Sequence, residues 1–215
     1  MRVVDLTHPL SQDTPVYPGT PGPCFEIVNT YGQDGFQETR MILSTHTGTH
    51  MDAPAHLFAD GTTLDQLPIT QFVGSALVID CSDLRPGQRI SMQRVQQHRA
   101  QADVVDFLLF YTGWERHWGT QQYFGAYPYI DDEIAQYMIR TRKKGIGLDT
   151  IGLDPISDTH LTLHRKLLCN NDFIIIENLA NLKAIGEQMF TLCALPIKCV
   201  AADGSPIRAI ALVDE

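Results

Sequence analysis

The segment His46-Thr-Gly-Thr-His-Met-Asp-Ala-Pro-Ala-His56 gathers three histidines and one aspartate within eleven residues. Histidine nitrogens and carboxylate oxygens are the usual protein ligands of zinc and related divalent metals. His46 and His50 are four residues apart, a spacing that would place both on one face of a helix. Gly48 lies between them and a proline follows closely, and both residue types disfavour a helix interior. We therefore expect a loop that leaves a strand ending near Thr45, where catalytic groups commonly lie.

The same segment has a plain alternative as a polar structural cluster. A single histidine is more often a hydrogen-bonded core or surface residue than a metal ligand. Four such side chains, however, are crowded here into one short segment: His46, His50, Asp52 and His56. A purely structural role leaves this crowding without a cause, so the spacing favours metal binding.

Composition and charge limit the kind of protein that carries this segment. The chain has 215 residues, 44% of them hydrophobic, which is enough for a sizeable core. One domain over residues 1–215 is the default, and a second small lobe is the alternative. The formal net charge of -9 makes nucleic acid a poor partner. The one basic cluster, Arg140 to Lys144, is expected to cap a helix end and face solvent.

The cysteines and the apolar runs predict a soluble, reduced, cytoplasmic protein. Five cysteines are present and none forms a Cys-x-x-Cys pair, so neither a disulfide framework nor a cysteine zinc site is expected. The N-terminus becomes polar at Asp5, before a signal-peptide core can form. The longest apolar runs, such as Val104 to Tyr111, are too short to span a bilayer, and no membrane association is expected.

Apolar periodicity predicts a mixture of strands and helices. Ser91 to Ala100 begins with a capping serine and has helical spacing. Asp131 to Lys144 is the clearest helix, with acidic residues at its start and Ile134, Tyr137 and Met138 on its apolar face. Strands are expected at Arg2–Leu6, Phe25–Thr30, Gln37–Thr45, Ser75–Cys81, Val104–Tyr111, Ile146–Leu148, Phe173–Glu177, Thr191–Ile197 and Ile207–Val213.

The order of these elements predicts the fold class. The proline-rich segment from Thr14 to Pro23 must be a loop, because its prolines cannot donate the hydrogen bonds of a sheet. Strands and helices are otherwise mixed along the chain. We therefore expect a single α/β domain with a mixed β-sheet or a small barrel and flanking helices.

The segment from His46 to His56 is similar to the motif His-x-Gly-Thr-His-x-Asp-x-Pro-x-His of the cyclase family, which includes bacterial kynurenine formamidase. Every specified position of the motif is matched. Five further segments resemble the family: Asp5–Leu10, Thr14–Gly19, Phe110–Trp114, Leu195–Lys198 and Ala202–Arg208. The resemblance covers nearly the whole chain, and it implies a metal-dependent hydrolase with a fold of the swivelling β/β/α type.

The resemblance also implies a second metal site, built from a histidine and a glutamate that follows it in a strand. Glu177 fits the glutamate, because Asn and Leu follow it and three isoleucines precede it. The alternative role for Glu177 is a solvent-exposed charge at a strand end. The three isoleucines before it argue against this role, because a carboxylate at the edge of a core usually has a partner. His164 and His160 compete for the histidine. His164 is preferred because it precedes a helix-like stretch, although it stands one residue further from Glu177 than the family pattern has it.

By resemblance, two metal ions would share a bridging Asp52. The other ligands would be His46 and His50 for one ion, and His164 and Glu177 for the other. Zinc is expected and manganese is the alternative, because both suit nitrogen and oxygen donors without a thiolate. Hydroxide produced at the metal would attack a carbonyl carbon. His56 would give a proton to the leaving amine, or else would only orient a ligand.

For the substrate, the resemblance points to N-formylkynurenine, an aryl formamide whose hydrolysis to kynurenine and formate is a step of tryptophan breakdown. Tyr17 and Trp114 are expected to form flat walls for its ring, with core packing as the alternative for each. Hydrolysis of isatin or another small amide, metal binding without catalysis, and partner recognition by the proline-rich loop are the competing functions. The resemblance further implies a homodimer or higher homo-oligomer.

Overall fold

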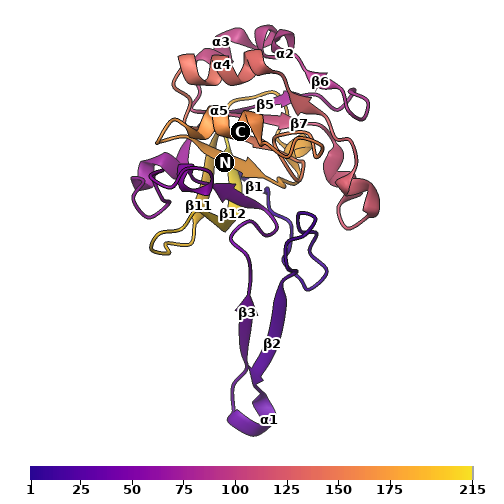
Figure 1. Cartoon of the computed structure of the whole chain (residues 1–215), viewed down its shortest axis with the longest axis vertical. Helices are drawn as coiled ribbons and strands as arrows, with labels where there is room; N and C mark the ends of the chain where they lie inside the picture. Colours follow the sequence, from indigo (N-terminus) through magenta and orange to yellow (C-terminus); the bar gives the residue numbers. More distant parts are fainter. Residues whose placement is uncertain (215) are drawn as a thin grey trace.

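A closed β-barrel forms the centre of the molecule (Figure 1), in a computed structural model that describes residues 1–214. Its seven strands are β4 (His50–Asp52), β5 (Val73–Asp80), β7 (Phe107–Tyr111), β9 (Gly145–Leu148), β10 (Ile174–Glu177), β11 (Phe190–Pro196) and β12 (Gly204–Val213). They pair in the order β12-β11-β5-β7-β9-β10-β4, and β4 pairs again with the first residues of β12, which closes the ring. The strand β1 (Arg2–Asp5) pairs with the last residues of β12.

The sheet is mixed, as the sequence predicts. The strands β5, β7, β9 and β10 are parallel to one another, whereas β1, β4, β11 and β12 pair antiparallel. Parallel neighbours need long crossover connections, which usually contain helices. The predicted single α/β domain with a small barrel and flanking helices is therefore confirmed.

Strand β5 shows how the barrel is packed on both sides. Ala76 and Val78 belong to the apolar cluster that fills the barrel, while Leu77 and Ile79 belong to a second cluster shared with the helices. Successive side chains of a strand point to opposite faces, so a strand buried on both faces reads as a continuous apolar run. This is why β5 and β7 could be identified as buried strands from the sequence.

The barrel is narrow at β9, where glycine occupies an inward-facing position. A Cβ atom added to Gly147 would lie 2.6 Å from a methyl group of Leu109 and 2.7 Å from one of Leu179. Real Cβ atoms do not approach other heavy atoms so closely. The side chains of neighbouring strands therefore fill the interior completely, and any larger residue at position 147 would push them apart.

Helices cover the parallel half of the barrel (Figure 1). They are α2 (Met92–Gln97), α3 (Arg99–Val104), α4 (Asp132–Arg140) and α5 (Thr162–Leu168). The side chain of Asp131 accepts a hydrogen bond from the backbone N–H of Ile134 at 3.0 Å and so begins α4. Ile134, Tyr137 and Met138 are buried, which confirms the predicted apolar face.

Two helix predictions need correction. The first predicted helix is divided at His98, where the backbone leaves helical geometry, into α2 and α3. The second ends at Arg140 instead of Lys144, and Arg142 adopts a left-handed φ of 54°. The chain then turns inward, and the Lys143 ammonium donates to the carbonyl of Val105 at 2.6 Å. Lys143 is therefore buried, and the predicted solvated basic face is wrong at this residue.

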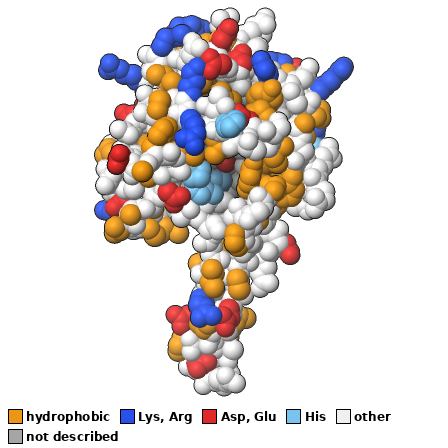
Figure 2. All heavy atoms as spheres, in the orientation of Figure 1, with side chains coloured by type: hydrophobic (Ala, Val, Ile, Leu, Met, Phe, Trp, Pro, Cys, Tyr) orange, Lys and Arg blue, Asp and Glu red, His pale blue; other side chains and the backbone are white. Residues whose placement is uncertain are grey.

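A two-stranded arm, residues 24–42, projects from the barrel (Figure 1). It consists of β2 (Cys24–Asn29), the short helix α1 (Tyr31–Asp34) and β3 (Glu38–Ile42), and β2 and β3 pair antiparallel. Figure 2 shows hydrophobic side chains at the surface of the arm. The large exposed ones are Ile27, Val28, Tyr31, Phe36, Met41 and Ile42. The chain enters the arm from the proline-rich segment, which is a loop as predicted.

The remaining elements are short. The strands β6 (Arg89–Ile90) and β8 (Tyr129–Ile130) pair in parallel beside the helices. Single 3-10 turns occur at η1 (Pro54–His56), η2 (Ile69–Phe72), η3 (Trp114–His117), η4 (Gln121–Phe124) and η5 (Leu182–Ala184). Within residues 1–214, no helix has the length and apolar character needed to cross a membrane.

Candidate metal centre

Strand pairing brings the two halves of the predicted metal site together. In the antiparallel pairing of β4 with β10, His50 lies opposite Glu177. In the pairing of β4 with β12, Asp52 lies opposite Gly204. Residues directly opposite one another on paired strands share a face of the sheet. The segment predicted as a loop is therefore partly a strand, and the barrel holds its side chains in place.

Two groups of side chains share Asp52, and within each group one ligand atom per residue lies within 4.8 Å of the others. The first group is His46, His50 and Asp52, and the second is Asp52, His164 and Glu177. The Oδ1 atom of Asp52 lies 2.6 Å from His46 Nδ1 and 3.3 Å from His50 Nε2. Its Oδ2 atom lies 3.5 Å from His164 Nε2. Each oxygen of Asp52 thus faces one group, as a bridging carboxylate requires.

Hydrogen bonds behind two of the histidines determine which ring nitrogen faces the centre. His50 Nδ1 donates to the carbonyl of Gly48 at 2.9 Å, and His164 Nδ1 donates to Asp154 Oδ2 at 2.6 Å. The Nε2 atom of each ring is then free to face Glu177, at 3.5 Å from its Oε2 for His50 and 3.0 Å from its Oε1 for His164. Such partners commonly orient histidines that bind metals.

All of these groups except the partly exposed His46 are buried, and their charges act on one another. Burial would raise the pKa of Asp52, but the charge of His46 and the hydrogen bonds from the histidines hold it well below its usual value. Burial would lower the pKa of His50 and of His164, but the surrounding carboxylates raise both. The pocket therefore stabilises positive charge at its centre. Its nitrogen and carboxylate oxygen donors, without a thiolate, fit a divalent ion such as zinc or manganese.

The structure separates the two candidate histidines of the second group. His164 is buried in the first turn of α5, where its ring meets Asp52 and Glu177. His160 is exposed in the preceding loop and belongs to neither ligand group within the described residues. The preferred histidine is thus the one that the fold brings to the cluster.

His56 lies beside the two groups, at the end of η1. Its ring centroid is 4.0 Å from that of His46 and 6.5 Å from that of His164. Burial lowers its pKa, which favours the neutral imidazole. The side chain is still 26% exposed and lines the cavity described below. An imidazole in this position can exchange a proton with a bound molecule.

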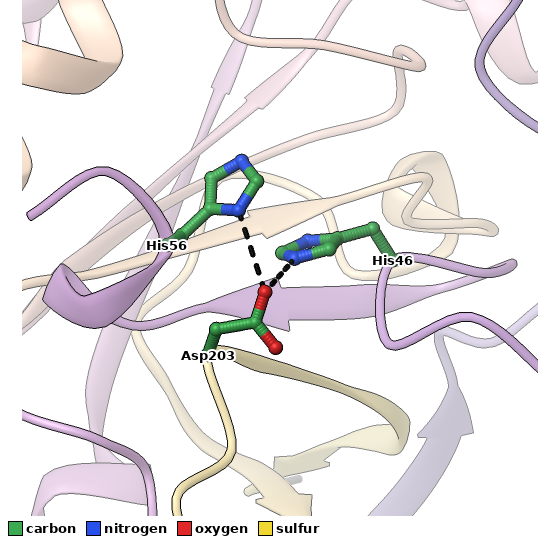
Figure 3. A group of neighbouring side chains, drawn as sticks. All are labelled: His46, His56 and Asp203. Atoms are coloured by element: carbon green, nitrogen blue, oxygen red, sulfur yellow. Dashed lines mark hydrogen bonds and ion pairs between the residues drawn. The ribbon is translucent and has the colours of Figure 1, made fainter. Parts of the chain in front are cut away.

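Asp203 also reaches this corner of the site, although the sequence analysis assigned it no role (Figure 3). Its Oδ2 atom lies 3.0 Å from His46 Nε2 and 3.7 Å from His56 Nδ1. The only signal in the sequence was the family-like segment from Ala202 to Arg208. Nothing in its local pattern connects an aspartate there with histidines so far away along the chain.

A cavity of about 230 Å³ opens over the ligand groups. Tyr17, Tyr127, Ile151 and Leu161 contribute its apolar wall. Histidine side chains are visible at the surface of the body above the arm (Figure 2). Tyr17, predicted as a substrate wall, is among the residues that line the cavity. Tyr127 also lines the cavity, although it was not predicted from the sequence.

Trp114 is not among the residues that line the cavity. It is 2% exposed, and its indole N–H donates to the backbone carbonyl of Tyr123 at 3.0 Å. Its ring packs edge-on against Tyr127. The expectation that Trp114 forms a direct substrate wall is therefore corrected: it supports Tyr127 from behind by packing.

Comparison with known proteins gives a consistent result over the whole chain. Residues 4–155 match the model of a family described as "Putative cyclase". A kynurenine formamidase of Bacillus cytotoxicus is 32% identical over 208 residues, which cover 96% of this chain and 95% of the relative.

Solved structures agree with the sequence comparison. Isatin hydrolase A from Labrenzia aggregata, bound to benzyl benzoate, superposes with a TM-score of 0.90 at 27% identity. The match covers 100% of this chain and 94% of that one. A potential metal-dependent hydrolase with cyclase activity superposes with a TM-score of 0.79 at 26% identity, over 100% of this chain and 98% of that one.

Proposed function

This chain belongs to the cyclase family, and from that premise we propose that it is a metal-dependent amide hydrolase. The observation that carries the proposal is the pair of ligand groups joined by Asp52 under a cavity, with His56 beside them. A protein that only stores or senses a metal needs the ligands, but it has no use for a neutral histidine facing an open cavity. Partner recognition by the proline-rich loop would leave the whole cluster unexplained.

The metal-binding residues in this proposal are His46, His50, Asp52, His164 and Glu177. Two ions, one for each group, suit the division of the two Asp52 oxygens between the groups. Zinc is the first choice and manganese the second, because both accept this donor set. When bound, such ions supply Lewis acidity, which polarises a carbonyl group and makes hydroxide available near neutral pH.

His56 is proposed as the group that protonates the leaving amine: neutral at rest, it would accept a proton from the attacking water and then give that proton to the amine nitrogen. It belongs to neither of the two ligand groups that share Asp52, and its exposed edge faces the cavity. Amide hydrolysis expels a strongly basic nitrogen, so a positioned acid is needed at that atom. The apolar wall of Tyr17, Tyr127 and Ile151 would hold the rest of the substrate and keep water from it.

N-formylkynurenine is the proposed substrate, because kynurenine formamidase from Bacillus cytotoxicus is similar to this chain over nearly its full length. Hydrolysis of its aryl formamide bond would yield kynurenine and formate. The ring would lie against Tyr17 and Tyr127. Its ammonium group could approach Asp158, an acidic residue of the cavity wall.

Isatin is a second candidate that one observation favours. Within the described residues, the cavity wall contains no lysine or arginine. The α-carboxylate of N-formylkynurenine therefore has no lysine or arginine partner on this wall, whereas isatin is uncharged and needs none. Ring opening of isatin requires the same metal chemistry and only a different fit to the wall, and isatin hydrolase A has a closely similar structure.

The deciding experiment measures turnover of both substrates by the purified protein. Each is assayed with a chelator, and then with zinc or manganese restored. Chelator-sensitive hydrolysis of N-formylkynurenine, with a kcat/KM well above that for isatin, is the expected result. The reverse order would assign the isatin reaction. A metal-loaded protein inactive on both substrates and on a panel of small amides would refute the hydrolase proposal.

We also propose that the protein is a homodimer. An isolated two-stranded hairpin is only marginally stable in water, yet the arm exposes several large hydrophobic side chains. A second copy of the chain that packs on the arm would cover them. Light scattering after gel filtration should give twice the mass of the chain. Ile27→Asp should yield monomers, and a wild-type protein that elutes as a monomer would contradict the proposal.

A cytoplasmic location is proposed as well. All five cysteines are free thiols, and three of them are exposed. Thiols persist in this state in a reducing compartment. Fractionation of cells that express the protein, followed by detection in the cytoplasmic fraction, is the test.

A further inference from the structure

Asp203 occupies a position from which one carboxylate oxygen faces two histidines of the site. The residue directly precedes β12, and its backbone carbonyl accepts a hydrogen bond from the N–H of Ala53 at 2.8 Å. Its backbone is therefore tied to the chain that carries Asp52. In Figure 3 its Oδ2 atom lies between the rings, 3.0 Å from His46 Nε2 and 3.7 Å from His56 Nδ1.

The ring of His46 has little freedom in this corner. Its Nδ1 atom lies 2.6 Å from Asp52 Oδ1, on the side of the ligand groups. Its Cε1 atom lies over Gly204, where a Cβ atom would approach to 2.5 Å, so only glycine leaves room for the ring. The ring of His56 covers part of it at a centroid distance of 4.0 Å. Both nitrogens of His46 are thus assigned by the fold, one to Asp52 and one to Asp203.

A neutral imidazole carries one N–H and one lone pair, and a metal can bind only through the lone pair. An acceptor placed at Nε2 holds the proton on that nitrogen and leaves the lone pair on Nδ1. His50 and His164 have their acceptors at Nδ1 and turn Nε2 to the centre. His46 instead turns Nδ1 to the centre and Nε2 outward, and Asp203 is the acceptor that would hold the proton on Nε2.

We propose that Asp203 is a positioning residue that keeps His46 in the tautomer with a free Nδ1. The inference rests on the proposed metal centre. Because Asp203 Oδ2 accepts from His46 Nε2 at 3.0 Å, loss of Asp203 would free the ring proton to move to Nδ1 and would weaken metal binding. No further group within the described residues is within hydrogen-bond reach of the outer nitrogen of His46.

The same three residues could instead hold a cation of their own, because one ligand atom from each of His46, His56 and Asp203 lies within 4.8 Å of the others. That arrangement would require His46 to bind one metal through Nδ1 and another through Nε2, which needs the loss of both ring protons. Neutral histidine supplies one lone pair only. The positioning role is therefore the one that the geometry favours.

The test compares Asp203→Ala and Asp203→Asn with the wild-type protein in a chelator competition titration with zinc, which needs no substrate. We expect Asp203→Ala to weaken binding of one zinc ion about 10–100-fold. Asp203→Asn should have a smaller effect, because its amide oxygen can still accept from Nε2–H. The near-isosteric variant also guards against a folding defect in the alanine variant.

Asp65→Asn is the matched control. Asp65 accepts a hydrogen bond from the backbone N–H of Ala201 at 3.0 Å, so it contacts the same loop, but it touches none of the site histidines. The amide oxygen of asparagine can still accept that bond. Zinc affinity in this variant should equal that of the wild type.

Long-range nitrogen–proton NMR spectra of zinc-loaded protein with isotope-labelled histidine report the tautomer directly. The wild type should show one ring protonated at Nε2 among the ligands, and Asp203→Ala should lose that signature. At saturating zinc, kcat should fall about 10-fold or more with KM little changed. Wild-type zinc affinity and an unchanged tautomer in Asp203→Ala would overturn the inference, as would a third bound zinc that this variant alone loses. Failure of the wild type to bind either zinc or manganese would instead overturn the proposed function.

Discussion

The Asp154 carboxylate accepts hydrogen bonds from three buried N–H groups, and replacing it with asparagine removes one of its two acceptor oxygens. The Oδ1 atom of Asp154 accepts from the backbone N–H of Leu163 at 2.7 Å. Its Oδ2 atom accepts from the backbone N–H of His164 at 3.0 Å and from His164 Nδ1 at 2.6 Å. Asparagine has nearly the same shape but a single acceptor oxygen, so its NH₂ group must face either Leu163 or His164.

Both orientations are costly, because all three residues are buried. If the NH₂ group faces Leu163, one buried backbone donor loses its acceptor, at about 1–3 kcal/mol. If it faces His164, the ring must turn or exchange its proton, and Nε2 no longer offers a lone pair to the metal. We expect metal-free Asp154→Asn to lose ~1–3 kcal/mol of unfolding free energy. We expect zinc affinity to fall up to about 10-fold, because a neutral amide oxygen holds the Nδ1–H of His164 less strongly than the carboxylate even where it faces the ring.

Urea unfolding of chelator-treated protein measures the first effect, and chelator competition measures the second. Asp158→Asn is the control, with the same chemical change in a partly exposed residue whose oxygens accept from the backbone N–H groups of His160 and Thr162. It should change the unfolding free energy by less than about 0.5 kcal/mol. Wild-type stability and zinc affinity in Asp154→Asn would refute the assignment of Asp154 as the group that orients His164.

Three further predictions concern the site itself. His56→Ala should keep its zinc but lose about 10²–10⁴-fold in kcat; metal analysis beside steady-state kinetics checks this, and wild-type turnover would remove His56 from the mechanism. Glu177→Gln should empty one of the two ion sites, so metal content that stays the same would locate the second site elsewhere. In chelator-treated protein, burial would lower the pKa of His46, but Asp52 and Asp203 raise it to about 9, above the ordinary 6.5. The protonated ring therefore stabilises the metal-free fold fully below about pH 6.5, and this contribution, at most ~3 kcal/mol, is lost as pH rises through about 9. The unfolding free energy from urea unfolding at about pH 6 and about pH 9.5 measures this contribution. His46→Gln should show a smaller change in unfolding free energy between the two pH values. An equal change in the wild type and the variant would contradict the assignment.

The sequence determined those features that depend on neighbours along the chain. Strands such as β5 and β7 were identified because burial on both faces produces an unbroken apolar run. The start of α4 and its apolar face followed from acidic residues at the helix start and from helical spacing. The ligand-rich segment from His46 to His56 could be recognised from the sequence because several candidate ligands lie within one short stretch, and residues so close along the chain are also close in space.

Tertiary structure decided the features that join distant segments. The choice of His164 over His160 depends on the path of one loop. The closure of the barrel depends on the pairing of β4 with β12. Trp114 was expected in the cavity wall but lies behind it, where its indole N–H donates to the backbone carbonyl of Tyr123 and its ring packs in the core. Asp203 reaches His46 only because β12 runs beside β4. Strand register and loop path are set by packing of the whole chain, and a local pattern of residues does not contain them.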